Sequence, residues 1–136
     1  MVESDKERVS VQEDQTASTS SQRTWVVLGS RFSLPKQYEI IDPVGQGAYG
    51  VVVAARDTSN NTEDNLVAIK KIEKAFEHKV FTLRTLRELK IMRLLNHENV
   101  LGIKMILQPP SLERFNELYV VSDLMETDLA QIIKSN

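Results

Sequence analysis

The residues best suited to chemistry in this sequence are a group of glycines and a lysine that follows them. Gly45, Gly47 and Gly50 form the pattern G-x-G-x-x-G. Because glycine has no Cβ, such a segment can turn tightly and bring its main chain close to phosphate oxygens. Lys70 follows the β-type run of residues 67–69, where it can reach the α- and β-phosphates of a nucleotide. The glycines alone would fit an ordinary turn equally well, but together with Lys70 they predict nucleotide binding.

The residues after the glycines decide between two kinds of nucleotide-binding fold. In a dinucleotide-binding domain a helix begins there, and its N-terminus meets the pyrophosphate. Residues 51–55 instead read Val-Val-Val-Ala-Ala, a run typical of a strand. We therefore expect the glycine-rich loop, residues 45–50, to be the turn of a β-hairpin. The valine run argues against a dinucleotide-binding oxidoreductase.

A carboxylate on the next predicted element is a candidate partner for the lysine. Residues 82–95 lack Gly and Pro and repeat apolar residues at helical spacing, which predicts a helix. The apolar positions one and two turns after Glu88 are Ile91, Met92 and Leu95. A carboxylate taken out of water needs a cation, so we expect a buried ion pair between Glu88 and Lys70 that orients the lysine. The alternative is a solvated Glu88 that pairs with Arg84 on its own helix.

With these features the sequence resembles protein kinases, and within them the MAP kinases of the extracellular-signal-regulated type. The resemblance covers roughly residues 23–136. It rests on four phrases in the order and spacing of that subfamily, at residues 47–50, 85–90, 97–100 and 123–129. It implies a serine/threonine protein kinase that transfers the γ-phosphate of ATP to proteins in signalling, with Lys70 and Glu88 as catalytic residues.

The resemblance also implies where the nucleotide lies. Asp123 would offer a main-chain carbonyl and Met125 an amide and a carbonyl to the adenine edge. Val52 and Ala68 would cover the ring, although by type alone both are ordinary core residues. Asp128 would approach the ribose, and it could equally cap the following helix. The implied ATP-binding set is Val44, Gly45, Gln46, Gly47, Ala48, Tyr49, Gly50, Val51, Val52, Ala68, Lys70, Ser122, Asp123, Met125 and Asp128.

Ser122 departs from the pattern of related kinases, which usually carry a larger gatekeeper residue such as Gln, Thr or Met. A serine at this position should leave room behind the adenine and admit bulky purine analogues.

Two kinase motifs are missing from these 136 residues. Phosphoryl transfer needs an H-R-D-x-x-x-x-N loop and a D-F-G aspartate that holds magnesium. We therefore interpret the sequence as a truncated kinase domain that lacks the C-lobe and does not turn over by itself. The Mg²⁺ that accompanies ATP would be held by the missing lobe, and the complete enzyme would meet protein substrates and an upstream MAP kinase kinase. The alternative is a non-catalytic lobe that acts as a binding or interfering module.

Composition excludes several other classes. A balance of 17 Lys and Arg against 19 Asp and Glu gives a net charge of −2, which favours neither nucleic acid nor an anionic membrane as partner. The absence of cysteine excludes disulfides and thiolate metal sites, and His78 and His97 are far apart, so we expect no metal site. No stretch reads as a membrane span or a secretory signal. We expect a soluble, cytoplasmic protein, with a nuclear location left open.

The order of predicted elements gives an α+β fold in three parts. Residues 1–22 read as a disordered tail, residues 23–37 as a short lead-in β-hairpin, and residues 38–136 as a kinase N-lobe, the hinge and the start of the next helix. The N-lobe would contain five antiparallel strands and one main helix. The strands are expected at residues 38–44, 50–56, 66–72, 101–107 and 118–121. Pro43 fits best on an edge strand, since it lacks an N–H.

Overall fold

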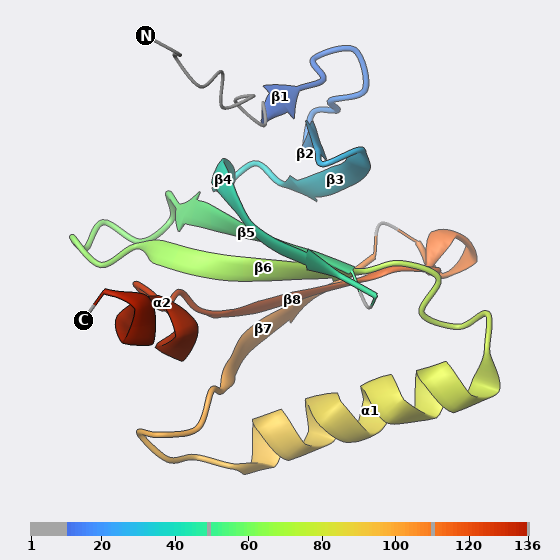
Figure 1. Cartoon of the computed structure of the whole chain (residues 1–136). Helices are drawn as coiled ribbons and strands as arrows, with labels where there is room; N and C mark the ends of the chain where they lie inside the picture. The colour runs from blue at the N-terminus through green and yellow to red at the C-terminus, as the bar shows by residue number, and fades with distance from the viewer. Residues whose placement is uncertain (1–10, 49, 110, 136) are drawn as a thin grey trace, which may run out of the picture.

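The computed structural model describes residues 11–48, 50–109 and 111–135. Two β-sheets and a long helix are stacked in three layers, with a short second helix near the C-terminus (Figure 1). The elements are β1 (Gln12–Glu13), β2 (Gln22–Val27), β3 (Ser30–Pro35), β4 (Tyr38–Gly47), β5 (Gly50–Asp57), β6 (Leu66–Ile72), α1 (Lys79–Leu94), β7 (Ile103–Leu107), the 3-10 helix η1 (Leu112–Arg114), β8 (Leu118–Asp123) and α2 (Leu129–Lys134).

The middle layer is an antiparallel five-stranded sheet in the order β4-β5-β6-β8-β7. It confirms the expected α+β fold with one main helix. β4 is an edge strand that contains Pro43, as expected for a residue that has no N–H to donate. β4 and β5 pair as far as Gly47 and Gly50, which confirms that the glycine-rich loop is the turn of a hairpin.

The first layer is the N-terminal sheet, formed by β1, β2 and β3 in that order. The predicted hairpin is its main part. Leu28 has φ 50° and Gly29 has φ 76°, and these two left-handed residues make the tight turn that the twist of paired strands favours.

The expected disordered tail is wrong for residues 11–22, while residues 1–10 lie outside the described residues. β1 pairs with β2, with Glu13 opposite Trp25. The Arg23 guanidinium donates two hydrogen bonds to the Glu13 carboxylate, at 2.7 and 2.9 Å. The Asp14 carboxylate then accepts the N–H of Thr16 at 3.1 Å and so closes the following turn. The contact of Glu13 with β2 and the turn at Asp14 together order a segment that has little apolar surface to bury.

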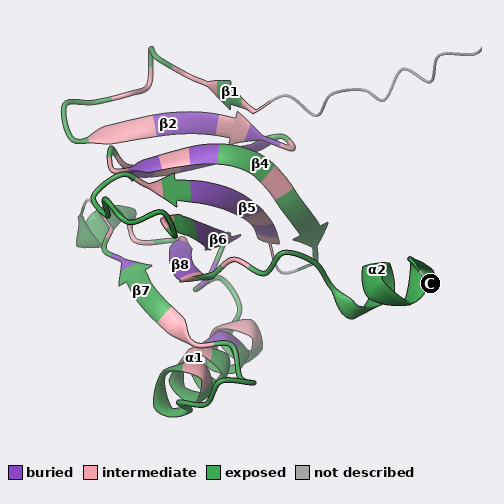
Figure 2. Ribbon diagram, turned by 90° about the vertical axis from the view of Figure 1, so that its left-hand side faces the viewer, coloured by how far each residue is buried: buried purple, intermediate pink, exposed green. Residues whose placement is uncertain are grey.

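The main core lies between the two sheets. Phe32 is fully buried, and its ring lies 5.8 Å from that of Tyr119 on β8. Buried residues follow the strands on both sides of this interface (Figure 2). The largest fully buried side chains are Phe32, Leu34, Ile69, Val27, Val53 and Val121. The lead-in hairpin is therefore the cover of one entire sheet face, and only the opposite face remains available for a site.

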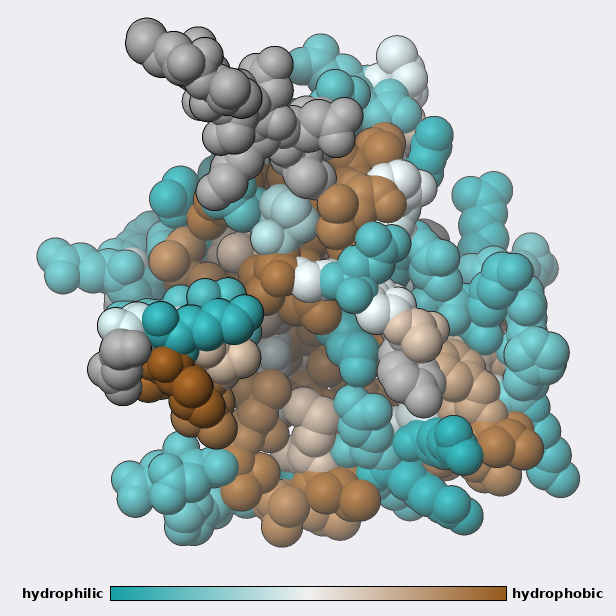
Figure 3. Space-filling model, viewed as in Figure 1, coloured by the Kyte–Doolittle hydropathy of each residue, from teal (hydrophilic) through white to brown (hydrophobic). Residues whose placement is uncertain are grey.

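Helix α1 packs on that opposite face by one side only. Phe81 and Leu89 contact a second, smaller core that contains Ile72 and Val120. Of the described residues in α1, Thr85 alone is buried. Hydrophobic side chains are exposed over α1 and α2 (Figure 3). None of the helices in the described part of the chain is long and apolar enough to cross a membrane.

The packing between the sheets predicts a large loss of stability on truncation of Phe32. Phe32→Ala should lower the free energy of unfolding by about 3–5 kcal/mol, because it leaves a cavity in the main core. Urea denaturation followed by the fluorescence of Trp25 measures this loss. The control Arg31→Ala alters a side chain that is 62% exposed, and it should cost less than about 1 kcal/mol. Equal losses in the two variants would contradict a core that is centred on Phe32.

Candidate functional site

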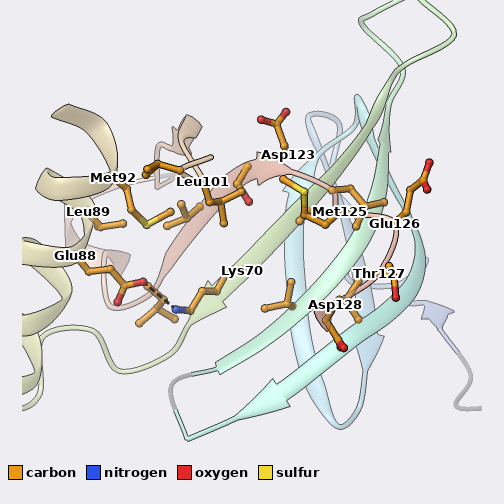
Figure 4. Close-up of a pocket in the computed structure, with 18 of the residues that line it drawn as sticks. Lys70, Glu88, Leu89, Met92, Leu101, Asp123, Met125, Glu126, Thr127 and Asp128 are labelled. Atoms are coloured by element: carbon orange, nitrogen blue, oxygen red, sulfur yellow. Dashed lines mark hydrogen bonds and ion pairs between the residues drawn. The ribbon is translucent and has the colours of Figure 1, made fainter. Parts of the chain in front are cut away.

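A cavity of about 700 Å³ opens between the five-stranded sheet, α1 and the segment that joins β8 to α2. We call it the main cavity (Figure 4). Its size falls within the range of small-molecule sites. The predicted site residues that line it are Val44, Val52, Ala68, Lys70, Glu88, Ser122, Asp123, Met125 and Asp128.

Strand register places the sheet residues of the cavity on one face. Val52 lies opposite Lys70, and Ala68 lies opposite Ser122. Side chains two positions apart on a strand share a face, so Ala68 and Lys70 point the same way. The cavity thus has a flat apolar wall at Val52 and Ala68 and an ammonium group beside it.

The expected ion pair is present, but its carboxylate is not buried. Lys70 Nζ lies 3.3 Å from Glu88 Oε1, and the two side chains point toward each other from β6 and α1 (Figure 4). The Lys70 side chain is 32% exposed and that of Glu88 is 52% exposed. The apolar neighbours of Glu88 suggested burial, yet α1 contacts the sheet by one side and leaves this position open. Such a pair contributes only about 0–1 kcal/mol to stability, so its main effect is on the direction of Lys70.

Most residues of the glycine-rich loop do not line the main cavity as expected. Val51 is 4% exposed and belongs to the core between the sheets, because alternation along β5 turns it away from Val52. Several loop residues border a second cavity of about 320 Å³ instead. These are Gln46, Gly47, Ala48 and Gly50. Gly45 pairs with Val52 in the sheet, and Tyr49 lies outside the described residues. Among the described residues of the loop, none lines the main cavity.

Gly50 is required at its position by the backbone. Its φ of +135° is one that other residues rarely adopt, and a Cβ built there would lie 1.9 Å from the carbonyl oxygen of Lys71. A Cβ built on Gly47 would meet no atom within 4 Å. The loop therefore ends in direct contact with the main chain of β6.

Asp123, the last residue of β8, and Asp128, just before α2, both have polar partners. The Asp123 carboxylate forms an ion pair with Lys104 at 2.8 Å and points away from Lys70 (Figure 4). Asp128 caps α2, since its Oδ1 accepts the N–H of Gln131 at 2.8 Å. The predicted capping role of Asp128 is confirmed, and the bond uses one of its two carboxylate oxygens.

Sequence reasoning missed three apolar side chains that line the cavity. Leu89 and Met92 reach it from α1, and Leu101 reaches it from the segment after α1. Helical spacing could have indicated Met92, which lies four positions after Glu88. Leu101 has no comparable local signal, because it enters the cavity through the path of the chain between α1 and β7.

Comparison with known proteins agrees with this geometry. The family profile described as "Protein kinase domain" matches residues 38–136. The chain is 48% identical over 120 residues to extracellular signal-regulated kinase 1 of Dictyostelium discoideum, a match that covers 88% of this chain and 22% of that protein. It is 49% identical over 111 residues to mitogen-activated protein kinase 6 of Oryza sativa subsp. japonica, covering 81% and 29% of the two chains.

The match to a third relative likewise covers most of this chain and less than a third of the other protein. Mitogen-activated protein kinase spk1 of Schizosaccharomyces pombe is 50% identical over 104 residues, which covers 76% of this chain and 27% of that protein. The chain thus spans less than a third of the length of each of these relatives.

The contact of the glycine-rich loop with β6 predicts unequal effects of two glycine substitutions. Gly50→Ala should lower the free energy of unfolding by more than about 2 kcal/mol, because a φ in this glycine-only region costs about 1–3 kcal/mol by itself and the Cβ meets main-chain atoms. Gly47→Ala should change it by less than about 1 kcal/mol. Urea denaturation measures the free energy of unfolding of both variants. Similar losses would show that Gly50 is not in close contact with the main chain of β6.

Proposed function

Since the chain belongs to the protein kinase domain family, we propose that it is the ATP-binding lobe of a serine/threonine MAP kinase. Such an enzyme transfers the γ-phosphate of ATP to serine or threonine residues of proteins in signalling. The observation that carries the proposal is the Lys70–Glu88 pair, 3.3 Å long, at one end of an apolar cavity.

The residues of the main cavity fit ATP. Val52 and Ala68 form a flat apolar wall on which a purine ring can lie. The main chain near Asp123 and Met125 would bind the adenine edge. Lys70 would bind the α- and β-phosphates, and Glu88 would hold the lysine in that direction. When bound, ATP supplies the phosphoryl group, and the part of these residues is to bind and orient it.

The remaining parts of the reaction would come from residues outside this sequence. In the described part of the chain, no three His, Cys, Asp or Glu side chains are grouped to hold a metal. The Mg²⁺ ligands and the catalytic aspartate would lie in a second lobe, as would the contacts with protein substrates and an upstream MAP kinase kinase. The greater length of the relatives supports this division. By themselves the 136 residues would bind nucleotide without turnover. The protein would be cytoplasmic, with the nucleus as a second location.

A second candidate function is favoured by the exposed apolar surface of the two helices. Leu94 on α1 is 81% exposed and Leu129 on α2 is 70% exposed. In a complete kinase a second lobe would cover such residues. If the cell makes the lobe by itself, this surface would serve a non-catalytic module that binds kinase regulators. The mass of the endogenous protein separates the two candidates, because the module would have the 15.5 kDa of this chain.

The ATP site predicts a specific effect of removing the lysine. Lys70→Met should weaken the binding of Mg·ATP more than about tenfold, since charge-assisted hydrogen bonds contribute about 1.5–3 kcal/mol. Isothermal titration calorimetry on the whole chain measures the dissociation constant. The control Lys90→Met makes the same charge change on the exposed surface of α1 and should leave affinity within about twofold. Equal affinities of the two variants would refute the proposed role of Lys70.

The small side chain of Ser122 predicts a change in ligand selectivity. The wild-type chain should bind a purine analogue with a bulky apolar substituent, because Ser122 is small and the cavity that it lines is also lined by the apolar Leu89 and Met92. Ser122→Met should weaken this analogue about tenfold or more through steric overlap and leave ATP within about threefold. Ser122→Ala is the control and should retain the analogue. Competition binding measures all three proteins, and unchanged analogue affinity in Ser122→Met would contradict an open path behind the purine.

A further inference from the structure

A second lysine, next to Lys70, is buried on the other face of the five-stranded sheet. The Lys71 side chain is only 5% exposed, and its Nζ lies 3.2 Å from Glu73 Oε1 and 3.1 Å from Glu117 Oε2. Such an ammonium is retained in a protein interior only where partners compensate for its lost hydration. The hydrogen bond from Ser30 and the nearby Lys71 ammonium hold the pKa of Glu73 below its usual value, so this carboxylate remains charged beside the lysine.

The lysine also binds the open edge of β3. In the described part of the chain β3 pairs with β2 on one side and with no strand on the other. Main-chain groups of alternate residues face that open edge, and two of them are met by side chains of the five-stranded sheet. Lys71 Nζ donates to the carbonyl of Arg31. The Tyr119 hydroxyl accepts the N–H of Ser33 at 3.1 Å.

The two side chains that bind β3 act as a pair. Lys71 on β6 lies directly opposite Tyr119 on β8. Cross-strand partners share a face of the sheet, so both reach β3 from the same position. Burial raises the pKa of Tyr119 far above its usual value, so its hydroxyl stays protonated. It donates a hydrogen bond to Glu117 Oε1 at 2.9 Å. The open edge of β3 is thereby attached to β6 and β8, two inner strands of the five-stranded sheet.

The main chain of Lys71 supports the glycine-rich loop. Lys71 lies opposite Val51, the residue that follows the loop. The Gly50 Cα approaches the Lys71 carbonyl so closely that a Cβ would lie 1.9 Å from its oxygen. The hairpin turn at Gly29 and Ser30 borders the same small cavity as the loop. One residue thus touches the N-terminal sheet with its side chain and the loop with its backbone.

We propose that Lys71 is a positioning residue for the nucleotide site. By binding the edge of β3, its side chain fixes the main chain of β6 at Lys71, on which the glycine-rich loop packs at Gly50. The N-terminal sheet then influences the nucleotide site, although none of its strands lines the main cavity. The effect on ATP affinity rests on the function proposed above, whereas the effect on the order of the loop does not.

Lys71→Met tests this role, because methionine keeps the length of the side chain and removes the ammonium group. The matched control is Lys36→Met, the same change at an exposed position just after β3. Nuclear magnetic resonance on the whole chain without nucleotide gives the backbone order parameters of Gly47 and Gly50. In Lys71→Met they should fall from about 0.85 toward 0.6, the range of flexible backbone. The Ser33 amide should exchange faster with solvent. Affinity for Mg·ATP should fall about 3- to 10-fold, because the nucleotide would then have to order a mobile loop on binding.

The outcomes separate positioning from stability alone. If Lys71→Met lowers the melting temperature and exposes the Ser33 amide, but leaves the order parameters of Gly47 and Gly50 equal to those of Lys36→Met, the proposal is wrong. If the wild-type chain does not bind ATP, the proposed function fails, and the order parameters still decide the role of Lys71.

A milder variant covers the case in which Lys71→Met does not fold. Tyr119→Phe removes only the hydroxyl that accepts the Ser33 N–H. It should increase the mobility of Gly50 in the same direction and by a smaller amount. An unchanged Gly50 order parameter in a folded Tyr119→Phe variant with a released Ser33 amide would overturn the proposal.

Discussion

The arrangement of this lobe depends on the alternation of side chains along β6. Lys70 faces the main cavity and meets Glu88, while Lys71 faces the N-terminal sheet and meets β3. Because successive side chains of a strand point to opposite faces, two adjacent lysines carry out unrelated tasks. A slip of one residue in the register of β6 would turn Lys71 toward the main cavity and Lys70 toward the apolar core between the sheets. The core between the sheets, centred on Phe32, prevents that slip.

The two sides of the sheet differ in how firmly they are covered. On one side the N-terminal sheet packs on the largest of the fully buried side chains, and its free edge is bound by Lys71 and Tyr119 of the five-stranded sheet. On the other side α1 is attached by a few apolar contacts and by one half-exposed ion pair. A pair of that kind adds little stability.

The sequence predicted a large part of this structure. The glycine-rich hairpin, the strand at residues 66–72, Pro43 on an edge strand and the partnership of Lys70 with Glu88 are all confirmed. The errors concern packing between elements that are distant in sequence. The tail expected at residues 1–22 contains a strand, Val51 faces the core, and the carboxylate of Glu88 is open to solvent.

Local chemistry explains what the sequence determined by itself. Residue type and spacing decide whether a segment is a strand, a turn or a helix, and charge decides which side chains need a partner, so elements and the Lys70–Glu88 pair could be read from the chain. Only the tertiary structure decided which face of each strand is covered, how deeply Glu88 lies and that Lys71 binds β3. These properties depend on the packing of one layer on another, which brings together residues as far apart as Arg31 and Lys71 and leaves no periodic signal in either segment.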